Sequence, residues 1–303
     1  MKSIGRTFDD FICDRETSCS PKTIVKYRDD VKIFFRFLKV IKLDSDLNEL
    51  KDLPVDVYKG FVVWMRSKRI RAVSIRSYCR SVKVFLRWCC LNGLCPDLTS
   101  NVKLPRDDSN VKLPLYASEV KKIDSCFDFL SYSVQPLRDY CIFHLMLDCG
   151  LRRQEVVHLK TDDLEFDKNV IIIMDSKGNK SRMVLIPDFL VEKIRSYLGN
   201  RINLPGFVFL SLRGSDPISD NTVKMLMQHL KKKSGVDRLH AHLLRHTFAT
   251  SYLVGGGNLE FLRVFLGHSD YDVTKIYSSM AAQMKMLHAD VYKLDPIFFT
   301  RGY

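Results

Sequence analysis

The sequence lacks long apolar runs and a leader-like N-terminus. Apolar segments such as 61–65 and 170–174 are short, whereas a membrane-spanning helix needs roughly 20 apolar residues. Residues 1–15 contain Asp9, Asp10 and Asp14 and no apolar core followed by a cleavage site, so they do not form a signal peptide. We therefore expect a cytoplasmic protein without a membrane partner.

The cysteines, although numerous, lack the pattern of a disulfide framework or a zinc site. Their number is nine, which is odd, and no Cys-x-x-Cys occurs. Several fall on apolar helix faces, which indicates reduced, buried thiols. His240, His242 and His246 lie close together, but no cysteine or carboxylate accompanies them at a zinc-like spacing. The sequence therefore predicts no metal site.

What the sequence has in excess is positive charge. The net charge is +13 and the isoelectric point is about 9.3, which indicates a polyanionic partner. Solubility alone would account for a modest surplus of cations. Here most of the surplus lies in residues 1–105 and falls on predicted helices, which favours nucleic acid.

Length and composition predict two globular domains. The 303 residues are enough for two ordinary cores, and 46% apolar with 27% charged residues is typical of globular chains. Within 99–114 the pentapeptide Asn-Val-Lys-Leu-Pro occurs twice, and its prolines preclude a helix. We expect a domain at 1–98, an extended linker at 99–114 and a second domain at 115–303.

Helix signals fill the first domain. A first amphipathic helix surrounds residues 8–12, and Leu53–Pro54 starts a third. Ser20 before Pro21 is a strong start signal for the second helix. Its expected apolar stripe consists of Ile24, Tyr27, Val31, Phe34, Phe35 and Leu38.

A fourth helix is expected over 73–91, with Gly93 as its stop. Cations recur along it without an acidic partner on the same helix. A charge run is usually a solvated face, but this one suits a track of phosphates. The pattern predicts DNA contacts by Arg71, Arg76, Arg80, Lys83 and Arg87.

The second domain begins with helices. Ser118 is the expected cap of the first one, an almost wholly apolar helix over 137–149 ends at Gly150, and another spans 153–160. The apolar helix is expected to be central.

Strand signals follow in the second domain. Residues 170–174 and 183–186 flank a Gly-Asn turn and predict an antiparallel hairpin, with 207–210 as a third strand. From a cap at Ser219 the chain is helical again, with a break at 255–257. The predicted fold is therefore mainly α: an N-terminal helical bundle and an α+β C-terminal domain with a small antiparallel sheet.

Several polar motifs lie far apart in the second domain. They are Gly150–Glu155, Ser176–Lys180 at the hairpin tip, His242–His246, and Leu266–His268 followed by Tyr277. Each has an ordinary explanation alone: a surface arginine, a solubilising lysine, a core histidine or a packing tyrosine. Together they supply what metal-free phosphodiester cleavage requires, namely cations for the nonbridging oxygens, a nucleophile and a proton donor.

These motifs, in this order and at these spacings, resemble the tyrosine recombinase (phage integrase) family. The similarity spans residues 115–280. The helices of the first domain resemble the family's SAM-like core-binding domain. In length and layout the chain is most similar to Xer-like recombinases and small mobile-element integrases. The resemblance implies a site-specific recombinase that needs neither ATP nor a metal, and hence no cofactor.

The resemblance also implies roles for individual residues. Tyr277 attacks the scissile phosphate to form a 3′-phosphotyrosine and release a 5′ hydroxyl. Arg152 and Arg245 bind the nonbridging oxygens. Lys177 protonates the leaving oxygen.

Three further residues take supporting roles in this scheme. His242 assists proton transfer at the nucleophile, His268 hydrogen-bonds the phosphate, and Glu155 orients its neighbours without touching DNA. Arg153, directly beside Arg152, is a second arginine that departs from the pattern.

The partners expected from the resemblance are double-stranded DNA with inverted-repeat core sites and a homotetramer on that DNA, with a partner recombinase or a directionality factor as additions. The two domains are expected to close around the duplex as a clamp. Integration of a mobile element and resolution of DNA dimers both stay open. The alternatives are a type IB topoisomerase-like activity and a non-catalytic DNA-binding regulator. Whether the tail at 280–303 docks in cis or in trans is also open.

Overall fold

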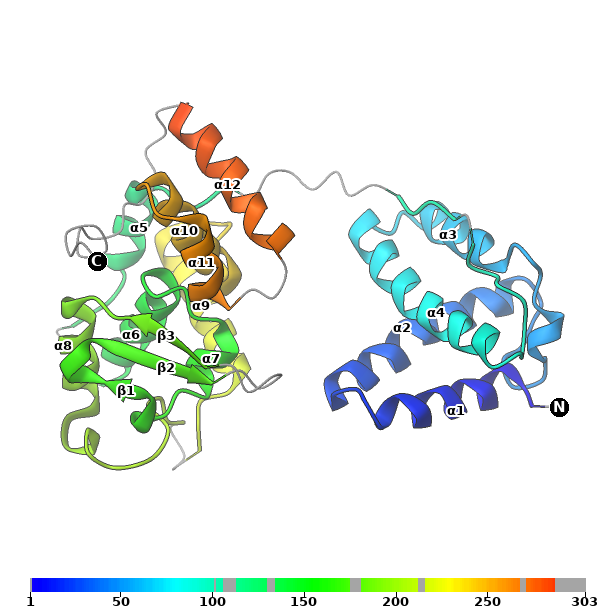
Figure 1. Cartoon of the computed structure of the whole chain (residues 1–303), viewed down its shortest axis with the longest axis horizontal. Coiled ribbons are helices and arrows are strands. Elements are labelled where there is room, and N and C mark those ends of the chain that lie inside the picture. The colour runs from blue at the N-terminus through cyan, green and yellow to red at the C-terminus, as the bar shows by residue number, and fades with distance from the viewer. Residues whose placement is uncertain are drawn as a thin grey trace. The chain divides into compact units, whose positions relative to one another are not determined.

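The computed structural model describes residues 2–100, 102–105, 113–129, 134–174, 181–211, 216–267 and 271–286, with only the helix path given for 271–276 and 286. The chain divides into two compact units, Met1–Asn110 and Val111–Tyr303 (Figure 1). This division falls within the expected linker. The predicted fold class is confirmed, because a helical first unit is followed by a helical unit that contains a small antiparallel sheet.

The first unit is built from amphipathic helices around one core. Ser20 caps the second helix as predicted, since its hydroxyl accepts a hydrogen bond from the Thr23 amide. The buried stripe of that helix contains Phe37 in addition to predicted residues, while Tyr27 and Phe35 are only partly buried. The helices are α1 (Ile4–Glu16), α2 (Pro21–Val40), α3 (Val57–Ser67) and α4 (Ala72–Leu91).

Two expectations for the first unit need correction. The third helix begins at Val57 and not at Leu53–Pro54, because a 3₁₀ turn over Leu50–Asp52 precedes it. The expected linker is not a tether along its whole length. Val102 and Leu104, which lie within the expected linker, pack against the core of the first unit, so the start of the segment belongs to that unit.

A buried carboxylate joins α2 to α4. Asp30 on α2 is 5% exposed and accepts hydrogen bonds from Lys26 at 2.7 Å and from Ser81 of α4 at 2.5 Å. Lys26 also donates to Ser77 of α4 at 2.8 Å. Because a buried charge must be paired to be tolerated, these contacts fix α4 and its cations against α2.

The second unit places helices around a sheet whose strand order is β1-β2-β3, with both neighbouring pairs antiparallel. In Figure 1 this sheet lies at one end of the unit and the orange-red α12 at the other. The strands are β1 (Leu164–Glu165), β2 (Val170–Met174) and β3 (Ser181–Leu185). The helices are α5 (Ala117–Asp124), α6 (Gln135–Leu147), α7 (Arg153–Val157), α8 (Asp188–Leu198), α9 (Asp220–Ser234), α10 (Ala241–Val254), α11 (Leu259–Leu266) and α12 (Tyr271–Met286).

The predicted hairpin is present, but the predicted third strand is wrong. Residues 207–210 form only single bridges, from Phe207 to Lys160 and from Leu210 to Pro217. One bridge to each of two different segments does not make a ladder. The third strand is instead β1, which pairs Leu164 with Ile171.

The start of α5 also differs from expectation. Tyr116 precedes the helix and Ser118 lies inside it. The Glu119 side chain accepts a hydrogen bond from the Tyr116 amide at 2.8 Å, which satisfies a donor that a serine cap would otherwise satisfy. The other predicted cap is confirmed, since Ser219 accepts a hydrogen bond from Thr222 at the start of α9.

The last described helix packs on its own chain. α12 lies against α10 and α11, and Met280 and Met284 are buried beside Tyr116 and Val254. The described part of the tail thus packs on its own domain, whereas residues 287–303, to which the question of cis or trans docking also applies, lie outside the described residues. None of the described helices is both long and apolar enough to cross a bilayer.

Candidate active site

The first site arginine is placed by a turn that only glycine fits. Gly150 has φ +62°, and a Cβ there would lie 2.6 Å from a ring carbon of Phe248. Leu151 is buried and anchors the turn. Arg152 is consequently the residue before the first turn of α7, with its side chain 41% exposed. It is anchored at its backbone and open to a ligand at its guanidinium.

Glu155 fixes the direction of the Arg152 side chain. Its carboxylate accepts hydrogen bonds from the Arg152 amide at 2.7 Å and from the Arg152 guanidinium at 2.8 Å. Arg182 of β3 donates to the same carboxylate at 2.7 Å. Burial alone would raise the pKa of Glu155, but the arginine contacts outweigh it and lower the pKa. The carboxylate is therefore ionised and matches the two cations.

The second site arginine, Arg245, lies on α10 and is 3% exposed. It donates to the Gly150 carbonyl at 2.6 Å and to the Leu266 carbonyl at 2.6 Å. Burial, followed by the charge of Arg152, lowers the pKa of Arg245 to about 9. It remains charged at neutral pH, and its partners orient its planar fork.

The C-terminal end of α11 gathers three arginines. Its successive carbonyls at Phe265, Leu266 and Gly267 accept hydrogen bonds from Arg182 at 2.9 Å, Arg245 at 2.6 Å and Arg152 at 2.9 Å, respectively. The last carbonyls of a helix have no partner within the helix and carry the negative end of its dipole. They are therefore well suited to hold guanidinium groups.

Tyr277 lies on α12 beside this cluster and is 5% exposed. Burial raises its pKa above the ordinary 10.0, and the charges of Arg245 and Arg152 partly oppose that rise. The Tyr277 ring contacts the ring of His246 at a centroid distance of 5.1 Å. A buried phenol within electrostatic reach of two arginines is thus assembled from α7, α10 and α12 of one chain.

The remaining predicted residues fall at different places. His242 is exposed in the first turn of α10, one turn before Arg245. Lys177 and His268 lie outside the described residues. Arg153 pairs with Asp220 of α9 at 2.9 Å, so the departure noted beside Arg152 leaves the cluster undisturbed.

Sequence reasoning missed two residues of this cluster. His246 was read as part of a motif and not as the ring that touches Tyr277. Arg182 was not considered, although strand alternation places it on the same face of β3 as buried Val184. An arginine on an inward strand face needs an acidic partner, and that signal was available in the sequence.

The predicted DNA-contacting cations form a stripe on α4. Arg76, Arg80, Lys83 and Arg87 follow steps of three and four residues, which places them on one helix face. The fifth, Arg71, precedes the helix as its N-terminal flanking residue. All but the partly buried Lys83 are exposed. Among the described residues none of the five forms an ion pair with a carboxylate.

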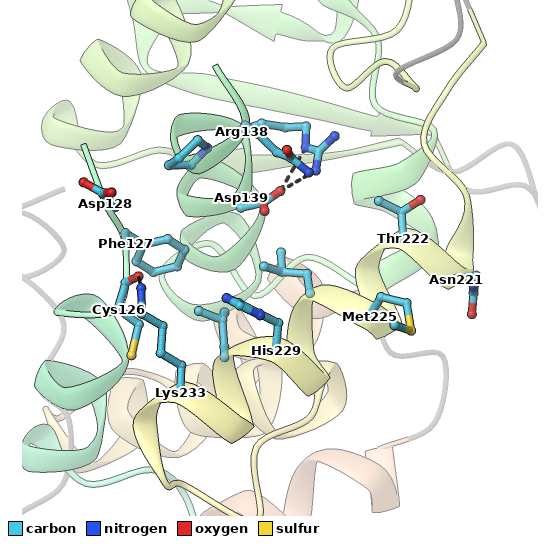
Figure 2. Close-up of a pocket in the computed structure, with 14 residues that line it drawn as sticks. Cys126, Phe127, Asp128, Arg138, Asp139, Asn221, Thr222, Met225, His229 and Lys233 are labelled. Atoms are coloured by element: carbon cyan, nitrogen blue, oxygen red, sulfur yellow. Dashed lines mark hydrogen bonds and ion pairs between the residues drawn. The ribbon is translucent and has the colours of Figure 1, made fainter. Parts of the chain in front are cut away.

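A cavity of about 680 Å³ lies away from the arginine cluster, between α6 and α9 (Figure 2). The Arg138–Asp139 ion pair, Phe127 and Lys233 are among its lining residues. None of the predicted site residues that the structure describes lines it. Within the described ranges no three His, Cys, Asp or Glu side chains are placed to hold a metal ion.

The fold is shared with solved DNA-recombining enzymes. A Tn1549 transposon integrase in complex with transposon right end DNA has a TM-score of 0.70 at 18% identity, covering 95% of this chain and 100% of that one. The XerH site-specific recombinase bound to a palindromic difH substrate has a TM-score of 0.72 at 18% identity, covering 91% and 81%. The chain thus shares the fold of these solved integrase and recombinase chains.

Sequence comparison gives the same class. Residues 115–284 match the phage integrase family, and residues 10–93 match the phage integrase N-terminal SAM-like domain. A tyrosine recombinase of Pseudothermotoga lettingae is 29% identical over 289 residues, which are 94% of this chain and 96% of that protein. Tyrosine recombinase XerC of Bacillus pumilus is 30% identical over 282 residues, 88% of each chain.

The chain therefore belongs to the phage integrase family. It is a tyrosine-type site-specific recombinase, an enzyme of DNA cleavage and strand transfer. The comparisons do not favour the topoisomerase-like or regulatory alternatives.

Proposed function

We propose that Tyr277 is the nucleophile that cleaves one DNA strand and forms a 3′-phosphotyrosine, while Arg152 and Arg245 bind the nonbridging oxygens of the scissile phosphate. The observation that carries this proposal is the convergence of these three side chains from α7, α10 and α12. Two guanidinium groups stabilise the negative charge on these nonbridging oxygens in the transition state. All three come from one chain, so the nucleophile acts in cis.

Cleavage requires that the Tyr277 phenol, whose pKa is raised, lose its proton. A phenol with the ordinary pKa of 10.0 is already protonated at neutral pH, and burial raises the pKa of Tyr277 further, so the phenol must lose its proton as it attacks. His242, one turn before Arg245 on α10, assists this transfer. The phenolic oxygen bonds to phosphorus, the 5′ oxygen leaves, and Lys177 supplies the proton that the 5′ oxygen needs. His268 hydrogen-bonds the phosphate.

DNA is the partner of both units in this scheme. The stripe on α4 carries Arg76, Arg80, Lys83 and Arg87, and such a row of cations follows a phosphate backbone. Arg71 extends it at the start of the helix. Lys26, held by Asp30 next to Ser77, adds a further cation beside α4.

The assembly and its DNA sites follow from the class of reaction. Strand exchange needs two duplexes and a nucleophile on each strand, so we expect a homotetramer on two core sites, each an inverted repeat around a short spacer. Integration or excision of a mobile element and resolution of DNA dimers use the same step. A partner recombinase or a directionality factor is required only if exchange runs in one direction.

A covalent adduct tests the proposal. Genomic fragments retained by the Tyr277→Phe variant define the binding site, and a nicked suicide duplex with that site traps the intermediate. The wild type should form a protein–DNA adduct and Tyr277→Phe should not, with both binding the duplex equally. Tyr197→Phe, which also removes a buried hydroxyl from the second unit, should retain the adduct. An adduct in Tyr277→Phe would remove the nucleophile assignment.

A further inference from the structure

Arg182 has no role in the proposed reaction, yet it is the innermost cation of the β hairpin. It lies on β3 directly opposite Ile173 of β2, on the face that packs against the core. Its side chain is 9% exposed. Its guanidinium is bonded to protein groups of two neighbouring elements, so we expect its effect on cleavage to pass through the groups that it contacts.

Those contacts join three elements of the active site. The guanidinium donates to Glu155 of α7 at 2.7 Å and to the Phe265 carbonyl of α11 at 2.9 Å. Glu155 in turn holds the amide and guanidinium of Arg152. The carbonyls of Leu266 and Gly267, next along α11, hold Arg245 and Arg152. Arg182 thus bonds directly to Glu155, which holds Arg152. It also bonds to the Phe265 carbonyl, which is next to the Leu266 carbonyl that holds Arg245.

The close fit at Gly267 gives a second, independent observation. Gly267 has φ +62°, and a Cβ there would lie 3.3 Å from both Cδ and Nη1 of Arg182. A side chain at position 267 would therefore press on Arg182 and strain the backbone as well. The chain thus ends α11 against the Arg182 side chain, at the residue whose carbonyl holds Arg152.

The charges also require Arg182. Glu155 is buried and ionised between two arginines. If Arg182 were neutral, one cationic partner of this buried carboxylate would be lost, and Glu155 would turn more fully to Arg152. Arg152 would then be held more tightly by Glu155 and be less available to a phosphate.

We propose that Arg182 is a positioning residue for strand cleavage, which shares Glu155 with Arg152 and fixes the end of α11 so that Arg152 and Arg245 address the same phosphate. This inference rests on the proposed function of Tyr277 and the two arginines. It extends that function to a residue that acts through Glu155 and the end of α11. A purely structural role would make Arg182 matter for stability alone.

The central measurement is single-turnover cleavage of the suicide duplex by Arg182→Gln, Arg182→Lys and the control Arg195→Gln. Arg195 is an arginine of α8 with a 45% exposed side chain. We expect Arg182→Gln to cleave on the order of 100-fold more slowly, because misplacement by about 1 Å costs that much, with the Kd for DNA within about threefold of wild type. Arg195→Gln should cleave at the wild-type rate.

Arg182→Lys separates charge from geometry. A lysine keeps the charge beside Glu155 but lacks the planar fork that reaches the carboxylate and the Phe265 carbonyl together. We expect an intermediate rate. Should Arg182→Gln fail to fold, as judged by its thermal transition, this variant carries the test, and a wild-type cleavage rate for it would overturn the proposal.

A double variant tests the path through Glu155. If Arg182 acts by sharing this carboxylate, Arg182→Gln combined with Glu155→Gln loses far less activity than the product of the two single losses. Losses that multiply would show that Arg182 acts elsewhere and would refute the proposed route.

A duplex with a different leaving group distinguishes a positioning role of Arg182 from an effect on the proton donor. Arg182 follows the hairpin tip that carries Lys177 in the sequence, so its loss could act by displacing the proton donor. A duplex with sulfur in place of the bridging 5′ oxygen needs no proton donor, because a thiolate leaves unaided. We expect this duplex to leave Arg182→Gln slow, and a restored rate would assign Arg182 to the proton donor instead. If wild type forms no adduct, the proposed function fails; if wild type cleaves and Arg182→Gln matches it, only this inference fails.

Discussion

Replacing Gly150 with alanine should damage the active site through a contact of one methyl group. The residue has φ +62°, and the new Cβ would meet Phe248 at 2.6 Å. The Gly150 carbonyl accepts a hydrogen bond from Arg245, so any shift of this turn moves an arginine that we propose to bind the scissile phosphate. Gly235 offers a matched control, since it has φ +71° with no atom within 4 Å of its Cβ position.

The two variants share one cost and differ in another. A left-handed conformation costs a non-glycine residue about 1–2 kcal/mol, and both variants incur it. Overpacking against Phe248 adds about 1–3 kcal/mol for Gly150→Ala alone. For a unit of this size each kcal/mol lowers Tm by about 2–4 °C. Gly150→Ala should therefore melt about 2–12 °C below Gly235→Ala.

Calorimetry of the two variants, followed by single-turnover cleavage, measures this difference. Gly150→Ala should also cleave more than about tenfold more slowly at a temperature where it is folded, whereas Gly235→Ala should cleave at the wild-type rate. Equal Tm values for the two variants would refute the steric reasoning. A normal cleavage rate for Gly150→Ala would refute the link from its carbonyl to Arg245.

Two further predictions concern stability and DNA affinity. Burial would lower the pKa of His144, but Asp124 and Asp148 raise it from 6.5 to about 9, so its stabilisation is full below about pH 6.5 and lost as pH rises through about 9. The free energy of unfolding should fall by on the order of 3 kcal/mol across this window, and His144→Gln, followed by denaturant titration, should lack the fall. Arg80→Gln should weaken DNA binding and reduce the slope of log K against log salt by about 1, while Arg195→Gln leaves the slope unchanged in a fluorescence titration.

The sequence predicted the start of a helix correctly where the capping hydrogen bond is made within the first helical turn. Ser20 and Ser219 were found because a hydroxyl that binds the amide three residues on needs no distant partner. Ser118 failed because the start of α5 depends on Glu119. The Glu119 carboxylate also accepts a hydrogen bond from Arg238 at 3.0 Å, and Arg238 lies more than a hundred residues further along the chain.

The sheet shows the same limit. Residues 207–210 have the composition of a strand, but no segment lies along them to form a ladder. β1 is only two residues long and follows a polar turn, so its sequence carries almost no strand signal. It is a strand because β2 offers Ile171 and Val170 as partners.

For the site, the sequence predicted the two arginines and the tyrosine that lie together in the second unit, but not the groups that hold the arginines. Motifs record side chains, whereas the acceptors for Arg245 and Arg152 include backbone carbonyls at Gly150, Leu266 and Gly267. Every residue has a backbone carbonyl, so the sequence does not show which carbonyls will accept these hydrogen bonds. The roles of the predicted site residues, Lys177 and His268 included, stay predictions.

The backbone origin of these acceptors has a consequence for engineering. Substituting the outward side chains of α11, such as Phe261 and Val264, leaves every carbonyl at its end in place. The exposed positions of α11 can therefore be randomised to change its binding surface, while the arginines held by its terminal carbonyls keep their positions. Among these exposed positions only 267 should be held constant in such a library, because its φ is positive and a Cβ there would contact Arg182.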